Sequence, residues 1–221
     1  MRMEPDFRFR DRTEAGQQLA LQLKSYADMA DGIVLALPRG GVPVGAEVAA
    51  ALHLPFDVYL VRKLGMPGHE ELAIGAIAQD QSCVFNNDIV AAGGIDREQI
   101  NQIVARELEE LERRDRLYRN GLSKLYLKGQ TVIVVDDGLA TGATMKAAIG
   151  AIRLLQPRTI VVAVPVGAQE ACNEIAPLVD HLVCLYRPVP FLGIGRWYKD
   201  FCQTADDEVL ALLQRGRFQR S

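Results

Sequence analysis

Cysteine and histidine are scarce in this sequence, and long apolar runs are absent. Four cysteines and three histidines occur among 221 residues, and no two cysteines form a Cys-x-x-Cys pair. This composition predicts free or buried thiols in a reducing cytosol, and it argues against a disulfide framework or a zinc site. Segment 1–12 is charged and lacks an apolar signal core, and no apolar run approaches the roughly 20 residues that span a bilayer. We therefore expect a cytoplasmic protein without a membrane segment.

An excess of basic residues is also missing. The formal net charge is −3, from 25 lysines and arginines against 28 acids. This balance disfavours a nucleic-acid binder that relies on a broad basic surface, although it permits a local cationic pocket for a phosphorylated ligand. A chain of 221 residues is long enough for one α/β domain with a sizeable core. Because no repeat, low-complexity tract or linker interrupts it, we expect a single domain over residues 1–221.

Apolar runs alternate with helical patterns along the chain. Asp96 opens a long charged helix, because Gln99 completes a capping box with it, and Gly121 is expected to end that helix. Segment 87–95 is ambiguous, with a short strand as one reading. Such alternation predicts βαβ units, and therefore an open, mainly parallel sheet flanked by helices. We expect strands at 33–37, 57–61, 73–78, 83–85, 132–135, 159–165 and 181–186, and helices from near 13, at 44–52, 142–155 and 168–175, and around 209–213.

The most informative segment is 132–144. Its β-branched residues 132–135 predict a buried strand, and Asp136 and Asp137 stand where that strand ends. Small and hydroxyl residues follow and lead into a helix. Ligands bind at the carboxyl ends of strands in open α/β sheets, and a helix start suits a phosphate. Carboxylates beside a phosphate would repel it unless they bind a sugar diol or hold Mg²⁺, directly or through water. The segment therefore predicts a site for a phosphorylated sugar.

This segment resembles the ribose-phosphate motif of the type I phosphoribosyltransferases. The family pattern is an apolar strand, two acids, three variable residues and Thr-Gly-x-Thr, and Asp136, Asp137, Thr141, Gly142 and Thr144 match it. The resemblance implies that the ligand is phosphoribosyl pyrophosphate, whose ribose hydroxyls bind the two acids. It also implies Mg²⁺ near the acids, held by them directly, through water or through the ligand. The 5′-phosphate would bind the phosphate loop, which consists of Gly138, Leu139, Ala140, Thr141, Gly142, Ala143 and Thr144.

A second segment, Pro38-Arg39-Gly40-Gly41, lies at a strand-to-helix turn. Backbone N–H groups, glycines and an arginine at such a turn form an anion nest, and a tight turn with a solvent-exposed arginine is the alternative. The segment resembles the pyrophosphate loop of the same family, above all that of xanthine–guanine phosphoribosyltransferases. By this resemblance Arg39, Gly40 and Gly41 bind pyrophosphate. A cis peptide is then expected either between Pro38 and Arg39 or between Arg39 and Gly40.

A third segment begins with Arg62 and Lys63 at the end of an expected strand. The Gly/Pro-punctuated residues 64–71 follow, and we expect a mobile loop that belongs to a lid over about residues 63–95. Orotate phosphoribosyltransferases have a similar Arg-Lys pair at the start of their catalytic loop. By this resemblance both residues bind pyrophosphate, and Lys63 neutralises the leaving group. His69 or the two acids after it would enter the site on closure; a solvated loop without a catalytic part is the alternative for His69.

The tail after the core, residues 187–221, is expected to form a small hood together with the N-terminal helix. Residues 191–201 resemble the hood of hypoxanthine–guanine phosphoribosyltransferases, in which an aromatic ring stacks on the base. By this resemblance Phe191 stacks, Leu192 offers backbone groups to the base edge, and Trp197 completes the base site. The alternative for Trp197 and Tyr198 is a hydrophobic clasp that holds the terminal helix.

One departure from the family leaves the acceptor undetermined. Purine enzymes of this family carry a lysine in the loop after the strand that follows the ribose-phosphate motif. Here that loop reads Val166-Gly167-Ala168, and no lysine occurs between Lys146 and Lys199. The family's recognition of a purine oxo group by lysine is therefore in doubt for this sequence, and Arg187 is the alternative.

The resemblance implies a reaction in which a nucleobase-like nitrogen displaces pyrophosphate, and it implies a homodimer. Asp136, Asp137, Lys63 and Arg39 would form the catalytic set. A non-catalytic sensor of phosphoribosyl pyrophosphate or a nucleotide, built on the same fold, is the main alternative. A phosphosugar enzyme outside the family is a third reading. The complete set of four side chains favours the enzyme, because a sensor could lose Lys63.

Overall fold

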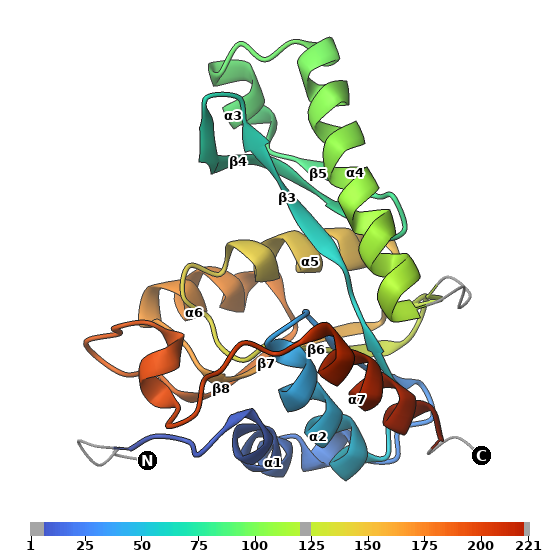
Figure 1. Cartoon of the computed structure of the whole chain (residues 1–221), viewed down its shortest axis with the longest axis vertical. Coiled ribbons are helices and arrows are strands. Elements are labelled where there is room, and N and C mark those ends of the chain that lie inside the picture. Colours follow the sequence, from blue (N-terminus) through green and yellow to red (C-terminus); the bar gives the residue numbers. More distant parts are fainter. Residues whose placement is uncertain (1–6, 120–124, 219–221) are drawn as a thin grey trace.

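A five-stranded parallel sheet forms the centre of the molecule. The computed structural model describes residues 7–119 and 125–218. The strand order is β2-β1-β6-β7-β8, and every neighbouring pair is parallel (Figure 1). The expected open, mainly parallel sheet is therefore confirmed. The strands are β1 (Gly32–Ala36), β2 (Phe56–Val58), β6 (Thr131–Val135), β7 (Thr159–Val166) and β8 (His181–Tyr186).

Helices cover both faces of this sheet, which explains why its central strands β1, β6 and β7 are almost entirely apolar. In β6, Ile133 and Val135 face one hydrophobic core, whereas Val132 and Val134 face the other. The first core is closed by α1 (Arg12–Gln22), α2 (Gly41–Leu52) and α7 (Asp206–Phe218). The second is closed by α5 (Ala143–Leu154) and α6 (Gln169–Ile175). Short 3₁₀ turns lie at Lys24–Tyr26, Ala176–Leu178 and Ile194–Trp197.

Residues 61–119 form an arm that projects from one side of the sheet (Figure 1). The arm holds an antiparallel sheet of β3 (Val61–Met66), β4 (His69–Ala78) and β5 (Cys83–Phe85), followed by α3 (Asn87–Ala92) and α4 (Arg97–Arg119). The single strand predicted at 57–61 is wrong. Val58 pairs with β1 of the central sheet, whereas Val61 pairs with β4 of the arm, so the chain changes sheets between them.

Two further predictions for the arm are also wrong. Residues 64–71 are not one loop, because β3 and β4 pair across most of this range and the chain turns at Pro67 and Gly68. Segment 87–95 contains a helix instead of a strand, and the Asn86 side chain caps it by accepting a hydrogen bond from the Ile89 amide at 3.3 Å. The strands predicted at 73–78 and 83–85 are confirmed within β4 and β5, and residues 79–82 connect them.

The long charged helix is confirmed as α4, and its capping box is present. The Asp96 side chain accepts from the Gln99 amide at 2.8 Å, and the Gln99 side chain accepts from the Asp96 amide at 3.0 Å. This reciprocal pair satisfies two of the amides that a helix start leaves open. The helix ends at Arg119, and the predicted stop at Gly121 lies outside the described residues.

The first described residues pair with the tail segment around Tyr198, beside the sheet. Phe9 and Tyr198 form a parallel bridge, in which the Phe9 amide donates to the Trp197 carbonyl and the Lys199 amide donates to the Phe9 carbonyl, both at 2.8 Å. The helix predicted from near residue 13 begins at Arg12. No helix in the described ranges has both the length and the apolar character needed to cross a membrane.

Candidate functional site

Pairing of β1 with β6 brings two distant sequence motifs into contact. The Leu37 amide donates to the Val135 carbonyl at 2.9 Å, so the chain passes directly from β1 into residues 38–41 beside the end of β6. A Cβ atom added to Gly41 would lie 2.8 Å from the Val135 carbonyl oxygen and 2.9 Å from the Asp136 Cα. Only glycine permits so close an approach. The pyrophosphate-loop motif therefore lies against the two acids.

The pyrophosphate loop contains the expected cis peptide, and its arginine makes a contact that was not predicted. The peptide between Pro38 and Arg39 is cis, which was the first of the two predicted positions. Arg39 is half-buried, and its Nη1 lies 3.4 Å from Asp206 Oδ1 at the start of α7. The arginine therefore faces the terminal helix and is not fully exposed to solvent.

Asp136 and Asp137 follow β6, as predicted, and their environments differ. Asp136 Oδ1 accepts a hydrogen bond from the Asp137 amide at 2.8 Å. Burial raises the pKa of Asp136 well above its usual value, and the charge of Asp137 adds to this effect. Burial also raises the pKa of Asp137, although the Arg12 guanidinium opposes that shift. Arg12 Nε and Nη2 both lie 2.9 Å from Asp137 Oδ2.

The phosphate loop, residues 138–144, joins β6 to α5. The Leu139 amide donates to the Val166 carbonyl at 2.9 Å and thereby fastens the loop to the end of β7. Gly142 has a left-handed backbone with φ 71°, and α5 begins at the next residue. Ala140, Thr141, Ala143 and Thr144 are exposed. The exposed N-terminus of α5 therefore lies beside the acids, and a helix N-terminus favours binding of an anion.

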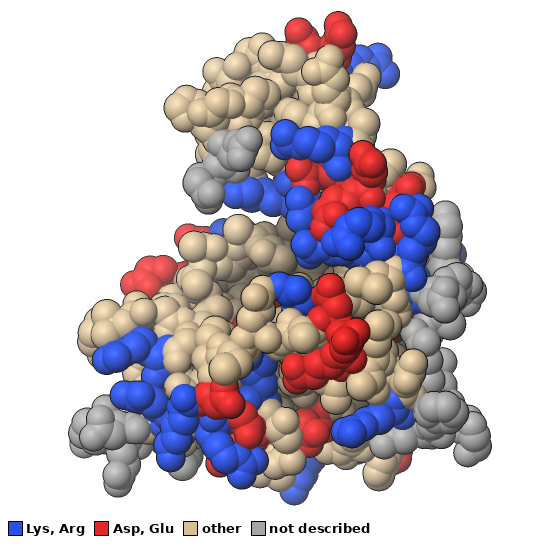
Figure 2. All heavy atoms as spheres, viewed as in Figure 1, with Lys and Arg blue, Asp and Glu red and all other residues tan. Residues whose placement is uncertain are grey.

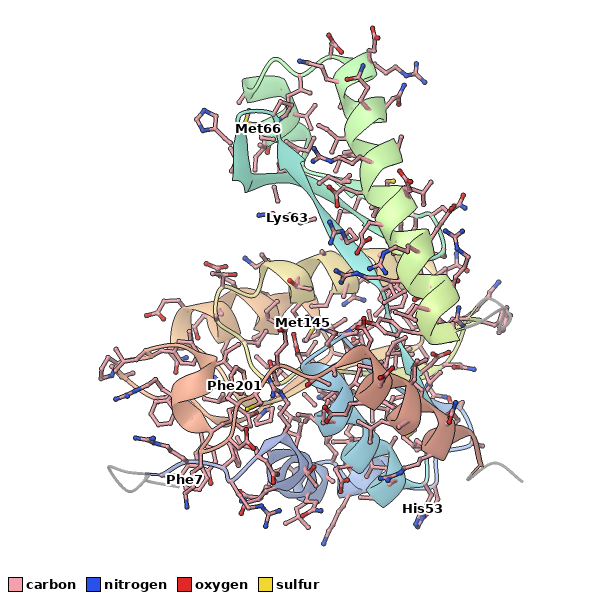
Figure 3. All side chains as sticks on the ribbon, in the orientation of Figure 1. Phe7, His53, Lys63, Met66, Met145 and Phe201 are labelled. Carbon is pink, nitrogen blue, oxygen red and sulfur yellow. The ribbon has the colours of Figure 1, made fainter. Side chains whose placement is uncertain are left out.

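The two predicted basic residues, Arg62 and Lys63, lie within β3 and make different contacts. Arg62 Nε and Nη2 lie 2.8 Å and 2.5 Å from Glu107 Oε2 on α4, so this arginine ties the arm together. Lys63 is exposed and extends from β3 toward the body of the molecule (Figure 3). Figure 2 shows that the surface is hollowed between arm and body, with lysine and arginine atoms on the arm side. His69 pairs with Met66 at the tip of the β3–β4 hairpin.

The predicted base-binding residues differ in how far they are buried. Phe191 is half-buried, whereas Leu192 is 63% exposed. Trp197 is half-buried in a small cluster with Phe9 and Tyr198. This cluster joins the tail to the first described residues and includes no residue of α7, so it is not the predicted clasp on the terminal helix. Ile194 reaches the residue after the acids, because a Cβ added to Gly138 would lie 2.8 Å from its Cγ2. A role for these side chains in base binding stays a prediction.

Sequence reasoning missed two residues that contact Asp137. Arg12 binds its carboxylate, and the Tyr198 hydroxyl donates to its carbonyl at 2.7 Å. These partners lie 125 and 61 positions away in the sequence. No local pattern connects residues so far apart, so no sequence signal could have identified the contacts.

Comparison with known proteins decides the family. The family model described as the phosphoribosyl transferase domain matches residues 12–177. The chain belongs to this family. The parallel sheet with helices on both faces is therefore a type I phosphoribosyltransferase fold. The match begins at Arg12 and includes both loops and the acid pair.

Three relatives illustrate the range of similarity. A protein of Mycobacterium tuberculosis, provisionally named a phosphoribosyl transferase, is 44% identical over 208 residues, which cover 94% of this chain and 47% of that protein. The crystal structure of TT1426 from Thermus thermophilus has a TM-score of 0.86 and 39% identity, with 95% of this chain and 99% of that chain covered. A Methanocella paludicola protein named hypoxanthine/guanine phosphoribosyltransferase is 26% identical over 126 residues, covering 57% of this chain and 46% of that protein. The chain thus spans about half the length of the curated relatives it matches.

Proposed function

We propose that this phosphoribosyltransferase moves the 5-phosphoribosyl group from phosphoribosyl pyrophosphate to a nucleobase-like nitrogen acceptor and releases pyrophosphate. The observation that carries the proposal is the contact between residues 38–41 and the acid pair, beside the open start of α5. Each of these three parts suits one part of the donor. The glycine loop suits the pyrophosphate, the acids suit the ribose hydroxyls, and the helix start suits the 5′-phosphate.

Fixed charges on both sides of the breaking bond between ribose and pyrophosphate would stabilise the transition state. As pyrophosphate leaves, positive charge grows on the ribose and negative charge grows on the leaving group. Asp136 and Asp137 lie where they favour the positive charge. Arg39 and Lys63 come from the loop and from the arm, and they favour the negative charge. The protein needs no nucleophile of its own for this reaction. Closure of the arm over the hollow would exclude water and limit hydrolysis of the donor.

Magnesium fits the donor set at this site. Mg²⁺ commonly binds one or two carboxylates together with substrate phosphates and water. Within the described ranges, no group of three or more His, Cys, Asp or Glu residues could hold a metal alone, so ligand oxygens would complete the coordination. Asp136 and Asp137 would hold the ion directly, through water or through the ligand. When bound, Mg²⁺ neutralises negative charge on the pyrophosphate.

The acceptor would lie between the phosphate loop and residues 191–197. Phe191 would stack on a planar base, Leu192 would present backbone groups to its edge, and Trp197 would support the pocket wall. Stacking of a base on an aromatic ring is worth about 1–3 kcal/mol. The Methanocella relative is named for purine acceptors, which supports a nucleobase-like acceptor here. The absence of a lysine after β7 argues for a different mode of base recognition.

The proposal is tested by measuring pyrophosphate release from phosphoribosyl pyrophosphate and Mg²⁺ across a panel of bases. The double variant Asp136→Asn with Asp137→Asn should abolish release while its circular dichroism spectrum stays that of the native protein. Asp88→Asn is the matched control, because Asp88 is an exposed acid on the arm. Near-native release by the double variant would sink the assignment. Donor binding without turnover for any acceptor would identify a sensor instead.

A further inference from the structure

Arg12, at the start of α1, lies outside every motif that resembles the family, yet it reaches the acid pair. We propose that Arg12 is a positioning residue, which holds the Asp137 carboxylate in one orientation and thereby sets the affinity for phosphoribosyl pyrophosphate. Arg12 does this without touching the ligand itself. The inference rests on the proposed function, since it concerns the same site.

The guanidinium of Arg12 contacts a carboxylate, a backbone carbonyl and an aromatic ring. Its Nε and Nη2 both bind Asp137 Oδ2 at 2.9 Å, and its Nη1 donates to the Cys202 carbonyl at 2.8 Å. Its flat face lies 3.9 Å from the ring centroid of Phe201, within the range of a cation–π contact. Figure 3 labels Phe201 within the body of the molecule. The arginine therefore has a single orientation, which the segment after residue 198 fixes.

Asp137 is also fixed from its other sides. Its carbonyl accepts from the Tyr198 hydroxyl at 2.7 Å. Its Oδ2 lies so close to Gly40 that a Cβ there would come within 2.1 Å of it. The side chains of Arg12 and Asp137 are each 11% exposed, so water has little access to the pair. The carboxylate therefore sits between the hood and the pyrophosphate loop, and Arg12 is the charged group that keeps it there.

Loss of Arg12 would release this carboxylate. A buried carboxylate without its charged partner is strongly disfavoured, and it would turn toward water and away from Gly40. Groups that are already ordered bind a ligand more tightly than groups that must be ordered on binding. The affinity for the donor should therefore fall even though the donor's own contacts are not removed.

The test is equilibrium binding of phosphoribosyl pyrophosphate with Mg²⁺, without acceptor, measured by calorimetry on folded protein. Arg12→Ala should weaken binding by about tenfold or more. Arg12→Lys keeps the charge but loses the planar two-nitrogen grip, and it should also weaken binding severalfold. Arg10→Ala is the matched control, because Arg10 is 67% exposed and pairs with its neighbour Asp11 at the surface. It should change the dissociation constant by less than about twofold.

A double-variant cycle separates positioning from general stability. In an Asp137→Asn background, Arg12→Ala should raise the dissociation constant for the donor by less than about twofold further. The carboxylate that Arg12 positions is already absent in that background. Full additivity would overturn the inference, and so would native affinity in Arg12→Lys. If Arg12→Ala does not fold, Arg12→Lys alone decides. Failure of the native protein to bind the donor would instead sink the proposed function, whereas native binding with unchanged variants would sink only this inference.

Discussion

Gly40 is the point at which the site tolerates least change. A methyl group placed there would lie 2.1 Å from Asp137 Oδ2 and 2.7 Å from its Cγ. Non-bonded heavy atoms attract at about 3.5 Å, so the two would have to separate by about 1.4 Å. The carboxylate cannot easily retreat, because Arg12 binds it at 2.9 Å. Gly40→Ala should therefore push the pyrophosphate loop away from the acid pair.

The expected cost follows from overpacking. Extra methyl groups in a closely packed site typically cost about 1–3 kcal/mol. In a chain of this size each kcal/mol lowers the midpoint of thermal unfolding by about 2–4 °C, so Gly40→Ala should lower it by about 2–12 °C. Binding of phosphoribosyl pyrophosphate should weaken by about tenfold or more, because the loop and the acids no longer meet. Thermal unfolding and calorimetric binding measure both effects.

Gly150 supplies the control for this reasoning. It lies inside α5, and a Cβ there would meet only Val84 side-chain atoms, the nearest at 3.4 Å, which is an ordinary contact distance. Gly150→Ala should stabilise the protein by about 0.5–1 kcal/mol, because glycine is unfavourable inside a helix. A native unfolding midpoint together with native donor affinity in Gly40→Ala would show that the loop and the acid pair accommodate the methyl group. An equal loss of midpoint and affinity in Gly150→Ala would show that the effect is not specific to Gly40.

Other predictions concern α4 and the arm. Arg119→Ala should lower the free energy of unfolding by about 3–5 kcal/mol, because it removes a buried partner 3.2 Å from Asp57; a loss under about 1 kcal/mol in urea unfolding would contradict this. Tyr118→Phe should cost about 1 kcal/mol, since the hydroxyl donates to Asp206 at 2.5 Å. Burial, followed by the hydrogen bond to Asp206, raises the pKa of Tyr118 to about 12. The folded pKa thus exceeds the unfolded value of about 10, so this stabilisation is complete below about pH 10 and is lost as pH rises through about 12. Unfolding measured across that window should show the loss in the native protein and a flatter profile in Tyr118→Phe. Lys63→Ala should lower kcat about 100-fold with little change in thermal midpoint, and native kcat would exclude Lys63 from the reaction.

Local sequence patterns predicted the elements that neighbouring residues determine. The β-branched run before Asp136 became β6, and the reciprocal pair of Asp96 and Gln99 correctly marked the start of α4. The errors lie where distant pairing decides the structure. An apolar run at 57–61 contains no information about which sheet each half will join, and the chain changes sheets inside it.

The same limit applies to the site. The resemblance to the family implied that residues 38–41 and the acids bind one ligand, and the structure brings that loop against them. The sequence could not predict that Asp137 is neutralised by Arg12 or that Arg39 faces Asp206. Those contacts depend on where α1 and α7 come to rest against the sheet. Tertiary packing sets that position, and helix periodicity does not specify it.

The partners of Asp137 become available at different times during synthesis. Arg12 is made before the acid, whereas Tyr198 follows it by 61 positions. The Cys202 carbonyl, which binds Arg12, is made later still. At a translation rate of about 5–20 residues per second, about 3–12 s separate Asp137 from Tyr198. The strands β1, β2, β6 and β7 can pair within that interval. A nascent chain can therefore hold a nearly complete sheet while Asp137 still lacks its hydrogen bond from Tyr198 and Arg12 still lacks its bond to Cys202.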